Sequence, residues 1–229
     1  MRIPRKILIP LALIWAFLVL YPDPAVLVRS VRDTLHPQID TAAVAGLAAS
    51  LPDNPRLIER AVLTRIVPYA YDWQVNGVPW YFPTTAEAVA AGSGDCESRA
   101  VVLASILAAK HIPYQLRMSL DHIWVDYPGK VPNAIENSGV TFAVRRGGHY
   151  FLHWPKDFHP YQELKDQLAI YWTPMPPSRK ALFLGGTLLI LSFNVLAGWR
   201  RRMVSGGRLL APAAADVPLR RRLAGRGRP

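Results

Sequence analysis

Cysteine is almost absent from this chain: Cys96 is the single one in 229 residues. An extracytoplasmic domain held together by disulfides would carry an even set of cysteines, so a disulfide framework is excluded. A lone thiol facing an oxidising compartment has to be buried or used chemically. The chain also lacks internal repeats and glycine-rich phosphate-binding loops, which excludes repeat architectures and the common nucleotide-binding motifs.

The middle of the chain lacks the basic excess that the net charge of +11 suggests. Residues 23–178 contain 13 Lys and Arg against 15 Asp and Glu, a balance of −2. The other 14 basic residues lie at the two ends, where only Asp216 opposes them. A nucleic-acid-binding domain concentrates basic residues on its folded part, so no nucleic-acid partner is predicted.

Two uncharged apolar runs lie between these basic ends and the middle. Residues 7–21 form a run of 15 and residues 181–199 a run of 19. A helix needs about 20 apolar residues to cross a bilayer. We therefore predict a membrane anchor in residues 1–22 and a transmembrane helix at 179–199. The first run is also short enough for a signal-peptide core, but no small-residue cleavage site follows it, which favours an uncleaved anchor.

The charge asymmetry predicts a topology. Basic residues flank membrane segments on the cytoplasmic side. Both termini should therefore be cytoplasmic, and residues 23–178 should form a periplasmic or extracellular domain. The tail at 200–229 contains nine Arg and one Asp, and we expect it to be disordered and close to anionic lipid.

Helical patterns come first in the predicted domain and strand patterns follow, which is typical of the α+β class. We expect helices at 40–51, 55–66, 84–91 and 96–111, and strands at 114–120, 122–127, 131–137, 140–144 and 149–154. The helix that begins at Cys96 is apolar nearly all round from Ala100 to Ala109, which marks it as a buried helix packed on a small antiparallel sheet.

Cys96 and His122 are the candidate nucleophile and base. The N-terminus of a helix favours a thiolate, and Gly92 and Gly94 leave room for a substrate backbone. The alternative is that Cys96 is a small buried hydrophobe and Asp95 an ordinary N-cap. His122 opens the strand beside the one that follows the Cys helix, and a cysteine nucleophile needs such a base.

The base also needs an orienting partner. With a three-residue loop at 128–130, strand pairing places His122 opposite Glu136. A four-residue loop would place Asn137 there instead. Asp126 shares the face of His122 but lies about 13 Å along the same strand. We favour Glu136, with Asn137 second and Asp126 third.

The sequence around Cys96 and His122 resembles the transglutaminase-like superfamily, and in particular a bacterial, membrane-anchored member of it. The resemblance covers residues 58–140 and rests on Tyr71-Asp72, Pro83-Thr84-Thr85, Gly94-Asp95-Cys96-Glu97, Ile112-Pro113 and His122-Ile123-Trp124-Val125. It implies a papain-like fold with a Cys-His-Asp site, carried here on Cys96 and His122. The family usually has Asp at the third position, and Glu136 fits that place best.

The expected function is acyl transfer through a Cys96 thioester at the cell envelope, on a peptide or protein substrate, by a peptidase, amidase or transglutaminase. The alternative is a catalytically inactive scaffold or binding module in a membrane assembly. An oxyanion hole would use the backbone N–H of Cys96 and a donor from Gln74, Trp73 or Trp80. No cofactor or metal is predicted, since His149 and His153 lie four apart on a strand.

Overall fold

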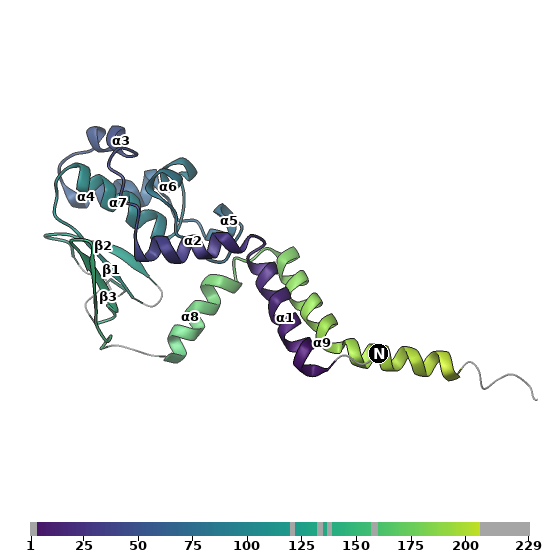
Figure 1. Ribbon diagram of the computed structural model, residues 1–229. Coiled ribbons are helices and arrows are strands. Elements are labelled where there is room, and N and C mark those ends of the chain that lie inside the picture. Colours follow the sequence, from purple (N-terminus) through teal and green to yellow (C-terminus); the bar gives the residue numbers. More distant parts are fainter. Residues whose placement is uncertain (1–3, 120–121, 132–134, 137–138, 157–159, 207–229) are drawn as a thin grey trace, which may run out of the picture.

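The computed structural model describes residues 4–119, 122–131, 135–136, 139–156 and 160–206. It is a mixed α+β structure, in which a layer of helices covers a small antiparallel sheet and a pair of long helices extends away from it (Figure 1). The helices are α1 (Arg5–Leu20), α2 (Pro24–Leu35), α3 (Ala45–Ser50), α4 (Pro55–Ala61), η1 (Val62–Ile66), α5 (Asp72–Val75), α6 (Thr85–Ala91), α7 (Cys96–Ala109), α8 (Pro160–Trp172) and α9 (Pro177–Gly206). The strands are β1 (Gln115–Met118), β2 (Ile123–Asp126), β3 (Ala143–Arg146) and β4 (His149–Leu152).

Local signals fix several helix ends where the sequence predicts them. The Asn54 side chain accepts hydrogen bonds from the backbone N–H groups of Arg56 and Leu57, directly before α4. Thr84 and Glu87 form a capping box at the start of α6, and Gly92 ends that helix at φ 62°. Each of these ends depends on residues within one turn, which explains why the sequence alone predicts them.

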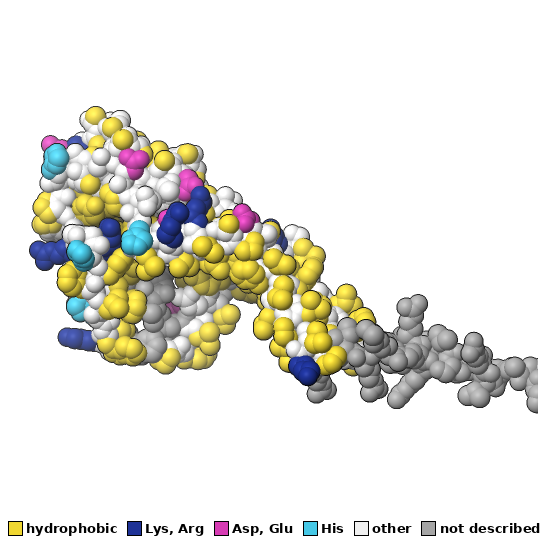
Figure 2. All heavy atoms as spheres, in the orientation of Figure 1, with side chains coloured by type: hydrophobic (Ala, Val, Ile, Leu, Met, Phe, Trp, Pro, Cys, Tyr) yellow, Lys and Arg dark blue, Asp and Glu magenta, His cyan; other side chains and the backbone are white. Residues whose placement is uncertain are grey.

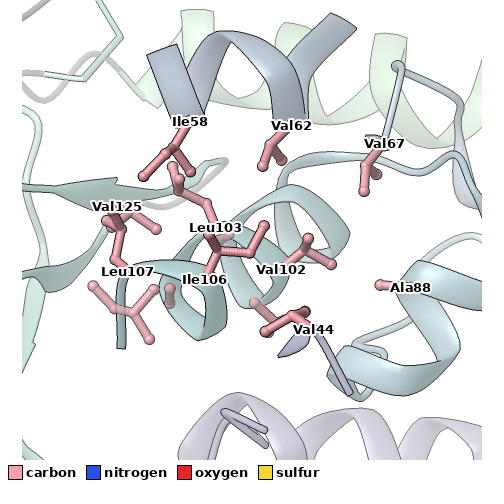
Figure 3. Close-up of a cluster of buried hydrophobic side chains, with 14 of the residues drawn as sticks. Val44, Ile58, Val62, Val67, Ala88, Val102, Leu103, Ile106, Leu107 and Val125 are labelled. Carbon is pink, nitrogen blue, oxygen red and sulfur yellow. The ribbon is translucent and has the colours of Figure 1, made fainter. Parts of the chain in front are cut away.

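Helix α7 is the centre of the core, as its pattern predicts. Every residue from Ala100 to Leu107 is buried. Figure 3 shows aliphatic side chains of α7 packed among Ile58 and Val62 above them and Val125 of β2 beside them. Burial of one such side chain stabilises the fold by about 1.5–3 kcal/mol, so this cluster holds the start of α7 in place.

The sheet has the order β2-β1-β3-β4, with all neighbours antiparallel. Leu116 of β1 pairs with Val125 of β2, and both side chains are buried in the core that contains α7. The expected strand at 131–137 is wrong for the part that the structure describes, because Ile135 and Glu136 lie in a bend and β2 pairs with β1 alone there. Pro132 has no N–H to give to a ladder, which disfavours a paired strand.

The sequence analysis did not predict helices α2 and α8. Asp23 caps α2 by accepting from the Ala25 N–H at 2.9 Å. Helix α8 follows the sheet and returns toward α5, where Trp73 Nε1 donates to the Tyr171 carbonyl at 2.7 Å. This bond fixes the C-terminal end of α8 beside the domain (Figure 1).

Helices α1 and α9 lie far apart in sequence but pack side by side and antiparallel, and this pair is called the α1–α9 hairpin below (Figure 1). Trp15 Nε1 donates to the Leu182 carbonyl at 3.0 Å, and Arg179 Nη1 donates to the Val19 carbonyl at 2.6 Å. A Cβ on Gly186 would lie 2.1 Å from Trp15 Nε1. Glycine at this position therefore allows the two helices to approach closely.

In the described part of the chain, no helix taken singly combines the length and the apolar composition of a membrane span. Lys6–Leu20 and Pro24–Leu35, bent by 72° relative to each other, meet those criteria as a pair. The side chains of 196–199, which end the second predicted span, lie outside the described residues. Of the tail predicted at 200–229, the first seven residues continue α9 as far as Gly206, and 207–229 lie outside the described residues. The two spans and the disorder of 207–229 therefore stay predictions.

Candidate active site

The backbone around Gly94 fixes the position of Cys96. The Gly94 N–H donates to the Pro68 carbonyl at 3.1 Å, and its carbonyl accepts from the Ala70 N–H at 3.0 Å. A Cβ on Gly94 would lie 2.4 Å from the Ser98 Cβ. Glycine is thus required for this close turn, and Cys96 follows it as the first residue of α7.

The half-buried Cys96 thiol is hydrogen-bonded to its sequence neighbour. Cys96 Sγ donates to Glu97 Oε2 at 2.9 Å, while Glu97 Oε1 accepts from Trp80 Nε1 at 2.8 Å. The indole thus holds the Glu97 carboxylate against the sulfur. In this resting arrangement the thiol proton points to a carboxylate and not to the imidazole.

The electrostatic surroundings oppose a thiolate. Burial raises the pKa of the Cys96 thiol well above its ordinary value, and the charges of Glu97 and Asp95 raise it further. A backbone contact with Ile123 acts in the opposite direction. The expected lowering of this pKa by the helix N-terminus is therefore wrong, because about half a positive charge at the helix end is outweighed by desolvation and nearby carboxylates.

Two further carboxyl groups lie beside the thiol. Burial and the charge of Glu97 raise the pKa of Asp72 to about 8. The same causes, in the same order, raise the pKa of Asp95, whose Oδ1 is buried with no hydrogen-bond partner among the described residues. The Asp95 side chain makes no capping bond to α7, unlike an ordinary N-cap. Within the described ranges, no three His, Cys, Asp or Glu side chains converge to hold a metal ion.

His122 directly precedes the first residue of β2. Its carbonyl accepts from the Ser119 N–H at 2.8 Å, and its ring stacks on Trp124 with centroids 5.7 Å apart. His122 Nε2 lies 3.3 Å from Glu136 Oε1. Since Nε2 faces the carboxylate, Nδ1 is the ring nitrogen that remains for a thiol.

Lys130 holds Glu136 in this position. Lys130 Nζ lies 3.1 Å from Glu136 Oε2 and 2.7 Å from Glu59 Oε1, and it donates to the Val125 carbonyl at 2.8 Å. Burial raises the pKa of Glu136, but hydrogen bonds and charges from His122 and Lys130 outweigh it, so this pKa lies below its ordinary value. The carboxylate is therefore ionised and well placed to orient an imidazole.

The structure separates the three candidates for the orienting residue. The predicted contact between Glu136 and His122 is confirmed, although the predicted strand pairing that led to it is wrong. Asp126 instead accepts from Arg117 Nε at 2.8 Å. Asn137 lies outside the described residues.

Cys96 and His122 line one cavity of 270 Å³, together with Glu97, Trp80 and Tyr171. A second cavity of 240 Å³ shares His122, Glu97, Trp80 and Tyr171 with the first. The two cavities are thus bordered in part by the same side chains. The elements that meet here are the start of α7, the β1–β2 turn and the end of α8.

The two expected indole donors are engaged elsewhere in this resting state, and the residues described around the Cys96 cavity include neither Trp73 nor Gln74. Trp73 Nε1 donates to the Tyr171 carbonyl, and the Gln74 side chain is held by its Oε1, which accepts from the Tyr71 N–H at 3.2 Å. Trp80 Nε1 donates to Glu97 but also lines the Cys96 cavity. Trp80 is therefore the candidate that a movement of Glu97 would free.

Comparisons with protein-family models, curated proteins and solved structures gave no match for this chain. The site therefore has to be interpreted from its own geometry.

Sequence reasoning did not identify Glu97, Lys130 and Tyr171 as parts of the site. Glu97 could have been found, since it follows Cys96 directly. Lys130 and Tyr171 carry no local signal, because both reach the site only through the fold.

Proposed function

We propose that the protein is a membrane-anchored, transglutaminase-like cysteine enzyme that transfers an acyl group through a thioester on Cys96. One observation carries the proposal: Cys96, at the start of a buried helix, and the imidazole of the His122–Glu136 pair line the same cavity. The combination of a nucleophile, a base and an orienting carboxylate is the arrangement that acyl transfer requires.

The proposed reaction starts from a neutral thiol. Rotation about the Cys96 Cα–Cβ bond moves Sγ from Glu97 to Nδ1 of His122, which takes the proton as Sγ bonds to the substrate carbonyl carbon. The C–N bond to the leaving amine then breaks, and the imidazolium gives its proton to that amine. Water or a second amine then attacks the thioester carbon as His122 takes its proton, the C–S bond breaks, and the imidazolium returns that proton to the sulfur.

Glu136 would orient the imidazole and stabilise its charged form in both half-reactions. Its lowered pKa supports this role, since the carboxylate stays ionised when the imidazole is charged. The Asp of the superfamily is here replaced by Glu, which is one methylene longer. The contact with Lys130 at 3.1 Å restricts this longer side chain.

Membrane anchoring is supported by the surface of the α1–α9 hairpin. Its outward side chains are large and apolar: Ile7, Ile9, Leu13, Ile14, Leu184, Leu188, Leu189 and Val195 are each about half exposed or more. Figure 2 shows hydrophobic side chains over the visible face of this hairpin. An apolar surface of this extent on a helical pair is typical of contact with lipid.

An inactive scaffold is the second candidate, because one observation favours it. The thiol proton faces Glu97, and its surroundings raise the thiol pKa. In that case Cys96 would be a packing residue and not a nucleophile. The two functions differ in whether any substrate forms a thioester with the protein.

The test is a panel of peptide amides and amine acceptors applied to the full chain in detergent. Cys96→Ser and His122→Ala should each abolish acyl transfer with little change in thermal unfolding, and their losses should not add, because the two side chains act as one unit. Glu136→Gln should be milder than either, at roughly 10⁴-fold, because an orienting carboxylate contributes less than the nucleophile and base. No thioester with any substrate, together with a loss of several kcal/mol in Cys96→Ser, would establish the scaffold.

The topology is tested separately with reporter fusions after Ser178 and at Pro229. The expected result is an external reporter at Ser178 and a cytoplasmic one at Pro229. A cytoplasmic reporter at Ser178 would contradict the envelope location.

A further inference from the structure

An apolar cavity of 420 Å³ lies where the α1–α9 hairpin meets the domain. Its walls come from the end of α1, the start of α9 and one side of α8. They include Leu20, Phe183, Leu164, Leu168, Trp172 and Met175. Among the described residues that line it, Gln167 is the one polar side chain that is not aromatic. The volume is that of a small-molecule pocket, and the apolar lining suits a hydrocarbon ligand.

This cavity adjoins the Cys96 cavity. Pro79, Trp80 and Tyr171 line both of them. A chain that filled the apolar cavity would therefore end against side chains that also border the Cys96 cavity. This shared wall places the apolar cavity next to the site of the proposed reaction.

Its position matches the expected level of the membrane interface. Tyr21, Trp80, Tyr171 and Trp172 surround it, and Lys180 Nζ lies 5.7 Å from the centroid of the Trp172 ring. Tryptophan, tyrosine and basic side chains gather at the level of lipid headgroups. The hydrophobic side chains of the hairpin continue from this level onto the adjoining part of the domain (Figure 2).

We propose that the 420 Å³ cavity binds the hydrocarbon chain of a lipid-linked acyl substrate, and places its carbonyl at Cys96. This inference rests on the proposed function and names its substrate class. A peptide segment would leave its backbone N–H and C=O groups unsatisfied between these walls, whereas a hydrocarbon chain leaves none. Entry is then lateral, from the bilayer and past the ends of α1 and α9.

The first experiment measures kcat/KM for 4-nitroanilides of straight-chain acids from acetyl to dodecanoyl. The full chain is used in vesicles of phosphatidylethanolamine and phosphatidylglycerol. Each methylene should raise kcat/KM by roughly fourfold until the cavity is full. Leu168→Trp narrows the cavity and should lower the dodecanoyl-to-acetyl ratio by roughly tenfold or more. The matched control Leu188→Trp, on the outer face of α9, should leave that ratio unchanged.

The second experiment needs no catalysis. A dodecanoyl amide with a photoreactive diazirine on its chain is cross-linked to the Cys96→Ala protein, and the labelled peptides are mapped. Labelling should fall on α8 and on Leu20–Tyr21, and Leu168→Trp should reduce it.

The two results together separate the inference from the proposed function. Labelling at α8 without turnover of any probe would support the hydrocarbon-binding site and contradict the proposed acyl transfer. The hydrocarbon site is contradicted if turnover does not depend on chain length, or if labelling is confined to the outer faces of α1 and α9. In the first case the proposed enzymatic function still stands. Absence of both labelling and turnover overturns both.

Discussion

Cys96 Sγ donates a hydrogen bond to Glu97 Oε2 at 2.9 Å, and Trp80 holds that carboxylate in place. The proposed nucleophile and the group that holds its proton are thus neighbours in sequence. The arrangement favours a neutral thiol, so the proposed reaction would require a substrate to displace Glu97 first. The reactivity of Cys96 would then depend on a residue other than its proposed base.

Glu97→Gln should make the thiol more reactive. Loss of the negative charge beside Cys96 should lower the pKa of the thiol, so alkylation by iodoacetamide should begin at a lower pH than in the wild type. The measurement is the alkylation rate of the full chain between pH 6 and 10. Asp53→Asn, a carboxylate that is 88% exposed and pairs with Lys110, is the control and should leave the curve in place. An unchanged pH dependence of alkylation in Glu97→Gln would show that the Glu97 charge does not raise the pKa of the Cys96 thiol.

Glu136 should contribute a stability that depends on pH. Its pKa in the folded protein lies below the ordinary 4.5, so the contribution is present above pH 4.5 and is lost as the pH falls through the folded pKa. Glu136→Gln should lower the free energy of unfolding by about 1.5–3 kcal/mol at pH 6. Wild type and variant should converge toward pH 3. Thermal unfolding at several pH values measures this, and a constant difference would contradict it.

Gly94→Ala should destabilise the protein, because its Cβ would meet the Ser98 Cβ at 2.4 Å. We expect a loss of about 1–3 kcal/mol in denaturant unfolding. Gly46→Ala is the matched control, since a Cβ there has nothing within 4 Å and α3 gains a better helix former. Equal effects of the two variants would show that the start of α7 tolerates a shift.

The hairpin offers a second matched pair in two adjacent glycines. Gly186→Ala places a Cβ 2.1 Å from Trp15 Nε1, so the indole must move and its bond to the Leu182 carbonyl is lost. This should cost about 1–3 kcal/mol. Gly185→Ala meets nothing within 4 Å and should be neutral or stabilising. Thermal unfolding in detergent micelles compares them, and a stable Gly186→Ala protein would rule out close packing of α1 on α9.

Both the helix ends and the buried character of α7 could be predicted from the sequence. Asn54 and Thr84 act on N–H groups within one turn, so their effect does not depend on the rest of the fold. The helix from Ala100 to Leu107 is apolar nearly all round, so it has to lie at the centre of the core. The pairing of β1 with β2 also follows from two short strands that are close in sequence.

The sequence did not contain enough to place α2 and α8, or to exclude a second partner for β2. In the described part of the chain β2 is an edge strand that pairs with β1 alone, and the expected neighbour at 131–137 is disfavoured because Pro132 has no N–H to donate to a ladder. Even so, Glu136 reaches His122, because Lys130 draws it inward between Glu59 and the imidazole.

The sequence by itself determined which groups can react: one thiol, at the start of a helix that must be buried, and a histidine at the head of a neighbouring strand. Only the tertiary structure decided what surrounds them. Asp95 and Glu97 act on the sulfur, Asp72 lines the same cavity, and Tyr171 of α8 completes that cavity. A helix start is a local property of a few residues, whereas the pKa of its first side chain is set by charge and burial that the whole fold assembles.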